Sequence, residues 1–441
     1  MNPDVMITHL VGASALIVLV AHLAGWAARR VGQPYIVGQL VAGIALGPSL
    51  LGEISPSLRA TVFPPAIAPV LSGLSQISLV LFLFAVGYEL DLRVLRGRTR
   101  AAFGVSIASF AVPMAAGCGG ALIFQRQLHA LGMPRHLPVA SVLFLGVALS
   151  ITAVPVLTAI VRENGLSRTV PGVIAVSAAG MLDVLGWTVL AGTMLPTAPD
   201  GALSWQVRLG LAVAFVTAML LGGRRLLLAT LWRIQLDPSL RLALLVGFAL
   251  ASAWVTNALG LHVIFGALLA GVVVPRERGG TLDADLVRPL NEISSLLLPF
   301  FFVVSGQAVA VGGLDGAGLV TLVAVTVLGM AVKIGSGTVT ARLSGLDKHD
   351  ARTVGVLLST RGLTELIALS AGLQAGLLSR RLYTILVFMA LATTLLTQPL
   401  LKLVRRLRLR ERGAEADGPQ EPLPVPEAPA AGSGEPAAGT G

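Results

Sequence analysis

The sequence is poor in charged residues, in aromatic residues and in cysteine. Only 12% of its 441 residues are charged, about half of the share in a soluble protein, whereas 55% are hydrophobic. So few charges cannot cover a globular surface, which excludes soluble enzymes, nucleic-acid-binding domains and secreted scaffolds. The single cysteine, Cys118, lies within an apolar run, so a disulfide framework and a cysteine-based metal site are excluded as well.

Apolar runs are what the sequence has in abundance. Thirteen of them follow one another, and most approach the 20 or so residues that cross a hydrocarbon core of about 30 Å. The eighth and ninth are separated only by a tight break around Gly260, which predicts either a helical hairpin or one long kinked helix. The sequence therefore predicts an all-α, multi-pass protein of the lipid bilayer with about 13 transmembrane helices, at residues 6–26, 35–51, 70–90, 101–124, 138–161, 170–194, 207–223, 240–259, 261–275, 293–311, 317–341, 353–375 and 382–404.

The basic residues predict how these spans are oriented. Of the 32 Lys and Arg residues, 24 fall in alternate connections and the final segment, six fall in the other connections, and Lys333 and Arg361 lie within spans. Because cytoplasmic loops carry the excess of Lys and Arg, we expect the N-terminus outside and the C-terminus in the cytoplasm of a cell (plasma) membrane protein. The net charge of +10 has the same origin, and no nucleic-acid partner is expected.

The composition changes after the last span. Residues 413–441 are rich in Pro, Ala, Gly and Glu and contain five acids and no base. We therefore divide the chain into a transmembrane domain at 1–404 and a segment at 405–441 that consists of a basic juxtamembrane stretch and a disordered cytoplasmic tail. No glycine-rich nucleotide fingerprint follows the last span, so no attached nucleotide-binding domain is expected.

Four charged residues lie deep within predicted spans: Asp183, Lys333, Arg361 and Glu365. Each costs about 2.5–3.5 kcal/mol on insertion scales, so they predict function or mutual pairing. Arg361 and Glu365 are four residues apart and share a helix face, which leaves a structural ion pair open, and Lys333 could extend toward the membrane surface. Asp183 has no basic residue within a helical turn, which favours a functional role.

Two spans also carry residues that break helices. The fifth contains Ser150, Thr152 and Pro155, and the twelfth contains Gly362 between Arg361 and Glu365. A proline removes a backbone donor and frees carbonyl groups in the preceding turn. Interrupted helices at corresponding places in two halves of a chain indicate a midplane substrate site of a transporter. Hydropathy and breaks make the fourth to sixth and the eleventh to thirteenth spans the matching triplets, although a simple kinked helix remains the alternative for either break alone.

Several segments, in this order, resemble the monovalent cation:proton antiporter-2 family within the sodium/proton exchanger superfamily. They are GQPYIVGQLVAGIALGP at 32–48, LFLFAVGYELD at 81–91, GALLAG at 266–271 and TRGLTEL at 360–366. Each is weak alone, but together they are specific, and the resemblance covers nearly all of residues 6–404. One position departs from the family pattern, because Leu182 stands where a polar residue usually precedes the key aspartate.

The resemblance implies a fold of thirteen helices with inverted repeats, a scaffold domain that forms a homodimer, and a six-helix core with two crossed discontinuous helices. It implies secondary active exchange of Na⁺ or K⁺ for protons at one aspartate of the sixth span, which matches Asp183. Thr152 would lie in the first unwound segment, and Lys333 in the eleventh span, where the superfamily often has a basic residue.

We therefore expect alternating access around an aspartate that holds either a proton or a cation. Thr152, Ser150 and the carbonyl groups freed near Pro155 would supply hard oxygen donors to the ion, which is the only metal expected at Asp183. Lys333, Arg361 and Glu365 would compensate charge, with Glu365 offsetting the positive ends of half-helices. No cofactor is expected.

Three other functions were weighed against this hypothesis. A proton-coupled exporter of an organic ion on the same fold is the main alternative, and the apolar Leu182 mildly favours it. A membrane sensor would need an output domain, which the predicted tail does not offer. An intramembrane hydrolase would need a second catalytic group near the lone Asp183, so we do not expect an enzyme.

Overall fold

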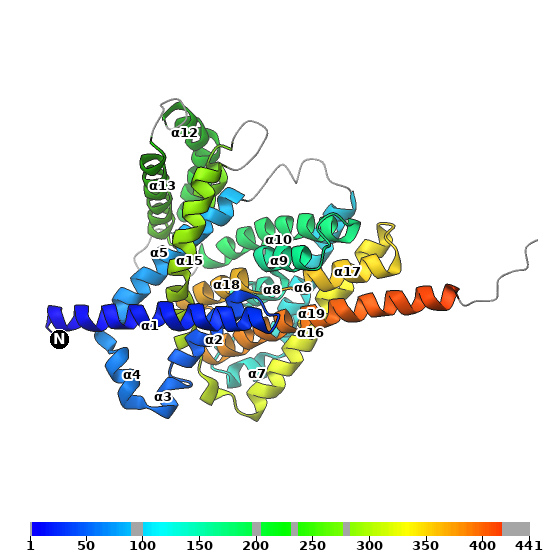
Figure 1. Ribbon diagram of the computed structural model, residues 1–441, viewed down its shortest axis with the longest axis horizontal. Helices are drawn as coiled ribbons and strands as arrows, with labels where there is room; N and C mark the ends of the chain where they lie inside the picture. The colour runs from blue at the N-terminus through cyan, green and yellow to red at the C-terminus, as the bar shows by residue number, and fades with distance from the viewer. Residues whose placement is uncertain (1, 90–99, 196–203, 231–236, 277–282, 417–441) are drawn as a thin grey trace, which may run out of the picture.

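The computed structural model describes residues 2–89, 100–195, 204–230, 237–276 and 283–416, and all regular structure in these residues is helical (Figure 1). The helices are α1 (Pro3–Arg30), α2 (Tyr35–Leu46), α3 (Leu51–Ile54), α4 (Pro56–Val62), η1 (Pro65–Ile67), α5 (Ala68–Glu89), α6 (Arg100–Ile123), α7 (Gln125–Ala130), α8 (Val139–Ser150), α9 (Val154–Glu163), α10 (Val170–Met194), α11 (Trp205–Ala218), η4 (Met219–Gly223), α12 (Arg224–Thr230), α13 (Pro238–Ala258), α14 (Val263–Val273), α15 (Ala284–Gln307), η5 (Val311–Gly313), α16 (Gly316–Leu343), α17 (Lys348–Leu358), α18 (Leu363–Gln374) and α19 (Arg380–Ala416).

The predicted spans all become helical. Within the described residues, twelve helical stretches are long and apolar enough to cross a membrane, counting each broken helix as one stretch. The ninth apolar run forms α14, which has only 11 residues and is therefore about 17 Å long. The prediction of about 13 membrane helices is confirmed, with α14 shorter than the others.

Helices α13 and α14 form a hairpin, not one long kinked helix. Gly260 makes the turn with a φ of 77°, a conformation that glycine adopts without steric cost. The hydroxyl of Ser252 donates to the carbonyl of Gly266 over 2.7 Å, and the amide of Gly266 donates to Thr256 Oγ1 over 3.2 Å. A Cβ at Gly266 would lie 2.1 Å from the carbonyl oxygen of Ser252, so only glycine allows this approach.

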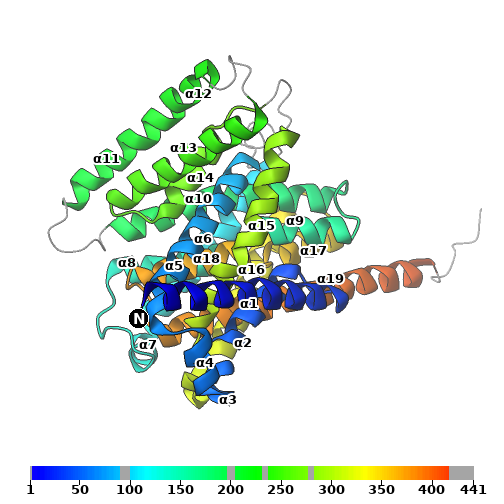
Figure 2. The same ribbon diagram turned by 60° about the vertical axis from the view of Figure 1, so that its left-hand side comes forward.

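The helices pack as two groups. Helices α1–α5 and α11–α15, which we name the scaffold group, are linked mainly through α5 against α14 and α15 and through α2 against α1 and α15. Helices α6–α10 and α16–α19, the core group, pack mainly on one another. In Figure 2, α11, α12 and α13 lie together at the upper left, whereas α19 of the core group lies lower.

The core group contains two equivalent triplets. In the first, α6 packs on α8 and α10, and α10 also packs on α8 and α9. In the second, α16 packs on α17 and α19, and α19 also packs on α17 and α18. The same four pairings recur, with the broken helix in the middle of each triplet. This is the repeat that the sequence predicted from hydropathy and helix breaks, and it comprises six membrane-crossing stretches.

Glycines of the family-like segments permit close helix contacts in the scaffold group. A Cβ at Gly306 of α15 would lie 2.4 Å from the backbone of Gly43 in α2, and a Cβ at Gly271 of α14 would lie 2.2 Å from the carbonyl oxygen of Phe84 in α5. Small residues let membrane helices approach closely, where van der Waals contact stabilises them. These glycines therefore fix the scaffold group and do not form a ligand site.

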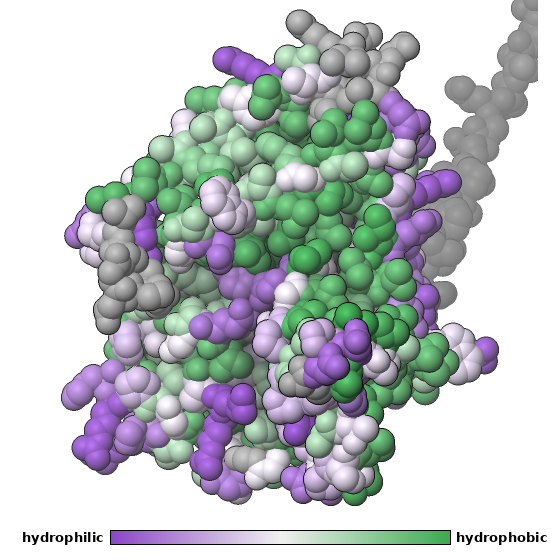
Figure 3. Space-filling view, turned by 90° about the vertical axis from the view of Figure 1, so that its left-hand side faces the viewer, coloured by the Kyte–Doolittle hydropathy of each residue, from purple (hydrophilic) through white to green (hydrophobic). Residues whose placement is uncertain are grey.

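The surface agrees with a protein that lies in a bilayer. Hydrophobic residues cover much of the face seen in Figure 3. Many large apolar side chains of α1, α11 and α16 are exposed in the structure, among them Leu23, Val213 and Val320. Because isolated soluble proteins rarely expose such continuous apolar surface, these helices are suited to contact lipid.

The last helix continues beyond the predicted final span. Helix α19 runs through Ala416, so the basic stretch at 405–412 forms its last turns. It extends from the body of the molecule in Figure 1. The predicted disordered tail falls mostly on residues 417–441, which lie outside the described residues.

Candidate functional site

The two broken helices cross at their breaks. Helix α8 ends at Ser150 and α9 begins at Val154, while α17 ends at Leu358 and α18 begins at Leu363. The amide of Ala153 donates to the carbonyl of Thr360 over 3.1 Å, and the hydroxyl of Thr152 donates to the carbonyl of Leu358 over 2.9 Å. The two unwound segments are therefore joined by hydrogen bonds, and the predicted crossing of discontinuous helices is present.

Pro155 and Gly362 explain where the breaks fall. Pro155 occupies the first turn of α9, where a proline does not need its missing N–H. A Cβ at Gly362 would lie 2.7 Å from Val156 Cγ2 and 3.4 Å from the Cβ of Ala153, so glycine permits the close approach of the two segments. Both residues stand at the places that the sequence predicted.

Two basic side chains bind the carbonyl groups at the end of α8. Arg361 donates to the carbonyl oxygens of Ala148 and Leu149 over 2.6 and 2.8 Å. The ammonium group of Lys333, on α16, donates to the carbonyl of Ser150 and, over 2.9 Å, to that of Ser109 on α6. The last carbonyls of a helix carry its partial negative charge, so these contacts satisfy and neutralise a helix end buried at the centre of the protein.

Arg361 also pairs with Glu365. Their side chains meet at 2.5 Å, and both are almost fully buried. Glu365 lies in the first turn of α18, so it also offsets the positive end of that half-helix. Its second oxygen, Oε2, is buried and has no hydrogen-bond partner among the described residues.

Asp183 lies on α10, which packs against α6, α8, α9 and α17. It is 6% exposed, and its Oδ1 has no hydrogen-bond partner within the described part of the chain. Among the described residues, Lys333 is the charged group that interacts electrostatically with the carboxyl group of Asp183. A buried carboxylate oxygen without a donor is costly, which indicates a group held ready for a proton or a cation.

Leu182 is fully buried beside this aspartate in the chain. It belongs to an apolar cluster that includes Ala153, Val156 and Leu357, so it packs against both broken helices. Because Leu182 is apolar, Asp183 is the acidic side chain that α10 contributes near the crossing of the broken helices.

The two hydroxyl groups of the predicted site face backbone carbonyls. Ser150 Oγ lies 2.8 Å from the carbonyl oxygen of Gly146 and 3.0 Å from that of Phe110. Thr152 donates its proton across the crossing, as described above. Each hydroxyl oxygen keeps lone pairs that can accept a hydrogen bond or bind a cation.

The sequence did not single out Thr360 as a site residue. Its side chain is fully buried in the second unwound segment, and its hydroxyl has no hydrogen-bond partner among the described residues. Among the described residues, Asp183 Oδ1, Thr360 Oγ1 and Glu365 Oε2 are thus buried oxygens without partners, and so is Ser109 Oγ, next to the carbonyl that accepts from Lys333. Oxygen is the ligand type that hard cations prefer, so this chemistry fits an alkali ion. Position within the broken TRGLTEL segment was the signal that could have identified Thr360.

A cavity of about 610 Å³ separates part of the core group from the scaffold group. It is lined by Gln39 of α2, Ser294 of α15 and, on α9, by residues from Pro155 to Glu163. The cavity therefore extends along α9 from Glu163 at its end to Pro155, next to the break between α8 and α9. Toward the other end of α5, Gln76 donates to Gln374 of α18 over 3.2 Å, so a contact joins scaffold and core there.

These features define a class of protein. Two discontinuous helices that cross at their breaks, in two equivalent triplets with a buried carboxylate packed against them, are the architecture of a secondary transporter. Residues 17–403 match the sequence profile of the family described as "Sodium/hydrogen exchanger, transmembrane". The chain belongs to this family, and it is a membrane transport protein, not an enzyme.

Several relatives are similar over most of the chain. The "Na(+)/H(+) antiporter NhaS4" of Synechocystis is 34% identical over 397 residues, which are 89% of this chain and 96% of that protein. The "Na(+)/H(+)-K(+) antiporter GerN" of Bacillus cereus is 28% identical over 88% of this chain and 94% of its own length. The "K(+)/H(+) antiporter 1" of Saccharomyces cerevisiae is 31% identical over 91% of this chain and 47% of its own, so the present chain spans about half of its length.

The fold also has solved counterparts. The structure of the sodium proton antiporter MjNhaP1 from Methanocaldococcus jannaschii at pH 8 matches with a TM-score of 0.67. The match covers 91% of this chain and 99% of that one, at 14% sequence identity. The similarity confirms the fold.

Proposed function

We propose that this protein exchanges a monovalent cation, Na⁺ or K⁺, for protons by alternating access, and that Asp183 binds either the cation or the proton. The observation that carries the proposal is the buried Oδ1 of Asp183, which lacks a partner among the described residues and lies on a helix packed against both broken helices. The names of the relatives support a cation/proton antiporter of this kind.

Competition for one carboxylate couples the two ions. A negative carboxylate attracts a cation, and protonation removes the charge that holds it, so each ion displaces the other. Thr152, Ser150 and Thr360 supply hydroxyl oxygens that complete the cation's shell together with Asp183. Exchange requires that Asp183 face the two sides of the membrane in turn, because only then does each ion leave on the side opposite to its origin.

Lys333, Arg361 and Glu365 act as fixed compensating charges in this scheme. Lys333 and Arg361 neutralise the end of α8, and Glu365 neutralises Arg361 and the beginning of α18. Because Lys333 and Arg361 are held by backbone carbonyls and Glu365 is paired with Arg361, we assign the charge that changes during a cycle to Asp183.

The orientation belongs to the same proposal. The N-terminus lies outside and the C-terminus in the cytoplasm of the plasma membrane, because this orientation puts the excess of basic residues inside. The cavity then opens toward the cytoplasm, and the Gln76–Gln374 contact lies on the outer side. We further assign residues 1–404 to transport and the scaffold group to a homodimer interface, and the cycle needs no bound cofactor.

Beyond the apolar Leu182, no observation favours the alternative of an organic-ion exporter, and the relatives are named as Na⁺/H⁺, K⁺/H⁺ or cation/H⁺ antiporters. Proton flux in everted membrane vesicles tests the proposal directly. In vesicles that hold an acidic interior, NaCl or KCl should collapse the proton gradient, whereas choline chloride should not. Vesicles without the protein give the background. A gradient that ignores Na⁺, K⁺ and Li⁺ alike would contradict alkali-cation exchange.

A further inference from the structure

Two grooves flank the beginning of α10. The first groove, of about 340 Å³, lies between α9 and α10 and has Arg162 and Ser167 together with Val161, Val173 and Val176 in its wall. Its walls combine one charged group and two hydroxyl groups, those of Ser167 and Thr158, with the methyl groups of three valines. It is therefore amphipathic along its length.

The second groove, of about 280 Å³, lies on the α6 side of the same helix. It is lined by Arg168, Thr169, Val170, Val173 and Ile174, and it also contacts Ala102 of α6. Val173 belongs to both grooves, so they meet at the first turn of α10. From Val170 to Ile174 the apolar wall covers about one turn of the helix, roughly 6 Å, and the polar Ser177 lines the groove beyond it.

The basic groups of these grooves are the guanidinium groups of Arg162 and Arg168. Both side chains are exposed, and neither guanidinium group forms an ion pair or a hydrogen bond within the described part of the chain. No acidic residue lines either groove among the described residues. The nearest acid in sequence, Glu163, faces the large cavity on the other side of α9 and accepts from Gln398.

This combination selects a particular ligand chemistry. Two unpaired guanidinium groups attract an anion and can bind phosphate oxygens in bidentate fashion. The apolar side chains that line the grooves beyond these arginines favour contact with hydrocarbon over contact with water. A phosphate ester with two hydrocarbon chains satisfies both demands, and basic sites between helix ends on the cytoplasmic side are suited to such headgroups.

We propose that an anionic phospholipid of the cytoplasmic leaflet binds at the beginning of α10. Arg162 and Arg168 hold its phosphate group, and its two acyl chains lie in the two grooves that meet at Val173. The choice of leaflet rests on the proposed orientation of the chain. The bound lipid contacts α6, α9 and α10, all of which belong to the core group, and α10 is the helix that carries Asp183. Lipid therefore stabilises the helix that presents the exchange site.

Direct lipid binding tests this site. The purified full-length protein in a neutral detergent is titrated with phosphatidylglycerol or phosphatidylcholine, and bound lipid is counted by native mass spectrometry. The wild type should retain phosphatidylglycerol in preference to phosphatidylcholine. In the double variant Arg162→Gln, Arg168→Gln, affinity for phosphatidylglycerol should fall about tenfold or more, and the preference should disappear.

The matched control is Arg405→Gln, Arg406→Gln. It removes the same charge from an exposed basic stretch of α19 that lines neither groove, and its lipid binding should resemble that of the wild type. If the double variant does not fold, the single variants Arg162→Gln and Arg168→Gln replace it. Each should show a smaller loss of affinity for phosphatidylglycerol.

Three results would overturn the proposal. The first is equal lipid binding by the wild type and the groove variant, and the second is an equal loss in the control pair, which would mean diffuse electrostatic attraction. The third is displacement of the lipid by equimolar inorganic phosphate, which would mean a site for free anions. Since no ion gradient is involved, the outcome is independent of whether the protein exchanges cations for protons.

Discussion

Arg361 is the residue on which the centre of the protein depends most. Its guanidinium group donates to two carbonyl oxygens of α8 and to Glu365 while it is 1% exposed. The spacing of four residues left the pairing with Glu365 open, and the structure contains it. The sequence could not predict the contacts with Ala148 and Leu149, because these join residues more than 200 positions apart and depend on the crossing itself.

Removal of the negative partner tests whether this pair is structural. In Glu365→Gln, Arg361 remains buried without a countercharge, so the protein should lose about 3–5 kcal/mol of stability and melt at a lower temperature in detergent. The control is Glu411→Gln, which breaks an exposed pair with His349 and Lys348 and should shift the melting temperature much less. A stable Glu365→Gln protein with weakened cation affinity would instead make Glu365 an ion ligand.

For the other site residues, the residue types could be predicted but the directions of their side chains could not. Asp183 was predicted because a lone charge in an apolar span is rare. Thr152 and Ser150 were predicted as cation ligands; what could not be predicted is that Thr152 donates its proton to the carbonyl of Leu358 and that Ser150 faces the carbonyl of Phe110 in α6. Side-chain direction at a helix break depends on which carbonyl groups the second broken helix brings near, and a single sequence does not contain that information.

At the scale of elements, the breaks were predictable and the end of the last helix was not. Pro155 and Gly362 identified both interruptions, because proline and glycine act on the local backbone. The ninth run was already the shortest of the thirteen and α14 agrees with it within two residues at each end, whereas the extension of α19 was not predicted, since hydropathy does not specify where a helix stops when polar contacts continue it. The choice of a hairpin for α13 and α14 required the contacts of Gly266 with Ser252 and Thr256.

The close approach at Gly362 leads to a prediction about the crossing. Gly362→Ala would place a methyl group 2.7 Å from Val156 Cγ2, so the two unwound segments must separate, and melting temperature and transport should both fall. Gly247→Ala on α13 is the control, because nothing lies within 4 Å of a Cβ there and alanine favours a helix more than glycine. Equal melting temperatures for Gly362→Ala and the wild type would contradict the close contact.

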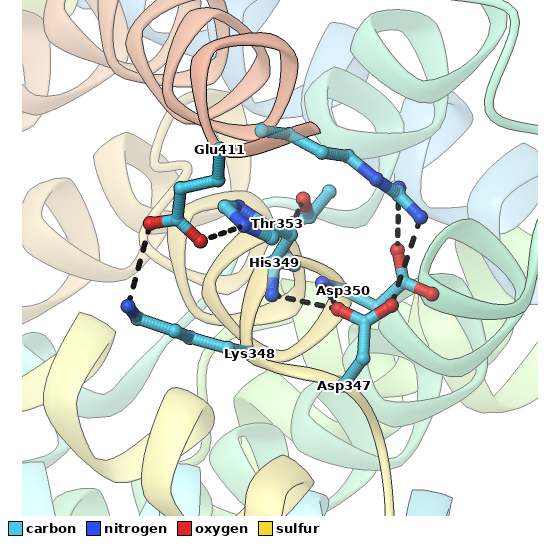
Figure 4. A network of polar contacts seen from close by, with 7 residues as sticks. Asp347, Lys348, His349, Asp350, Thr353 and Glu411 are labelled. Atoms are coloured by element: carbon cyan, nitrogen blue, oxygen red, sulfur yellow. Dashed lines mark hydrogen bonds and ion pairs between the residues drawn. The ribbon is translucent and has the colours of Figure 1, made fainter. Parts of the chain in front are cut away.

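A network of charges fixes the beginning of α17 to the end of α19 (Figure 4). Arg408 lies 3.0 Å from Asp350 and 3.6 Å from Asp347, and Glu411 lies 2.8 Å from His349. Asp347 Oδ1 also accepts from the amides of His349 and Asp350, so it caps α17. The extension of α19 beyond the predicted span is thus stabilised by contacts with the first turn of a broken helix.

This cap predicts a pH dependence. The hydrogen bond from the Asp350 amide, with smaller contributions from His349 and Arg408, holds the pKa of Asp347 below its usual range. A lowered pKa in the folded state means that the stabilisation is complete above about pH 4 and is lost as the pH falls below that value. Asp347→Ala should therefore cost about 1 kcal/mol at pH 7 and progressively less below pH 4.

Melting temperatures measured between pH 3 and pH 8 check this prediction. Asp347→Asn, which keeps a capping oxygen but has no charge to titrate, should retain part of the stability at every pH. If the difference between Asp347→Ala and the wild type were constant down to pH 3, the carboxylate would not be the stabilising group.

For the whole molecule, the sequence predicted the fold class, the two triplets and the family. Hydropathy and positive charge follow directly from the membrane as a solvent, so they can be read without an alignment. The packing of α6–α10 on α16–α19 and the cavity beside α9 depend on contacts between distant segments, and no local pattern encodes them. The separation into a scaffold group and a core group provides the two bodies that alternating access requires.

Charge balance over a full cycle gives a prediction for the whole protein. Leu182 leaves one acid on α10 at the site, and one carboxylate that exchanges one proton for one monovalent cation moves no net charge. We therefore expect electroneutral exchange. This prediction requires that Lys333, which donates to the carbonyl oxygens of Ser109 and Ser150, keep one protonation state throughout the cycle.

Proteoliposomes with a clamped membrane potential measure this balance. The reversal point at matched cation and proton gradients should not move with voltage, although each uncompensated charge would contribute about 2.3 kcal/mol per 100 mV. A reversal point that shifts with voltage would reject the one-for-one exchange and indicate Lys333 as a second proton site.

The most direct test of the account is cation-dependent proton flux through Asp183→Asn in proteoliposomes, beside the wild type. The amide occupies almost the same volume but cannot take up a proton and release it in exchange for a cation. The variant should elute as a folded protein in size-exclusion chromatography and should show no flux in response to Na⁺ or K⁺ at any pH, whereas the wild type does. Flux at the wild-type rate in the folded variant would contradict the assignment of Asp183 as the exchange site.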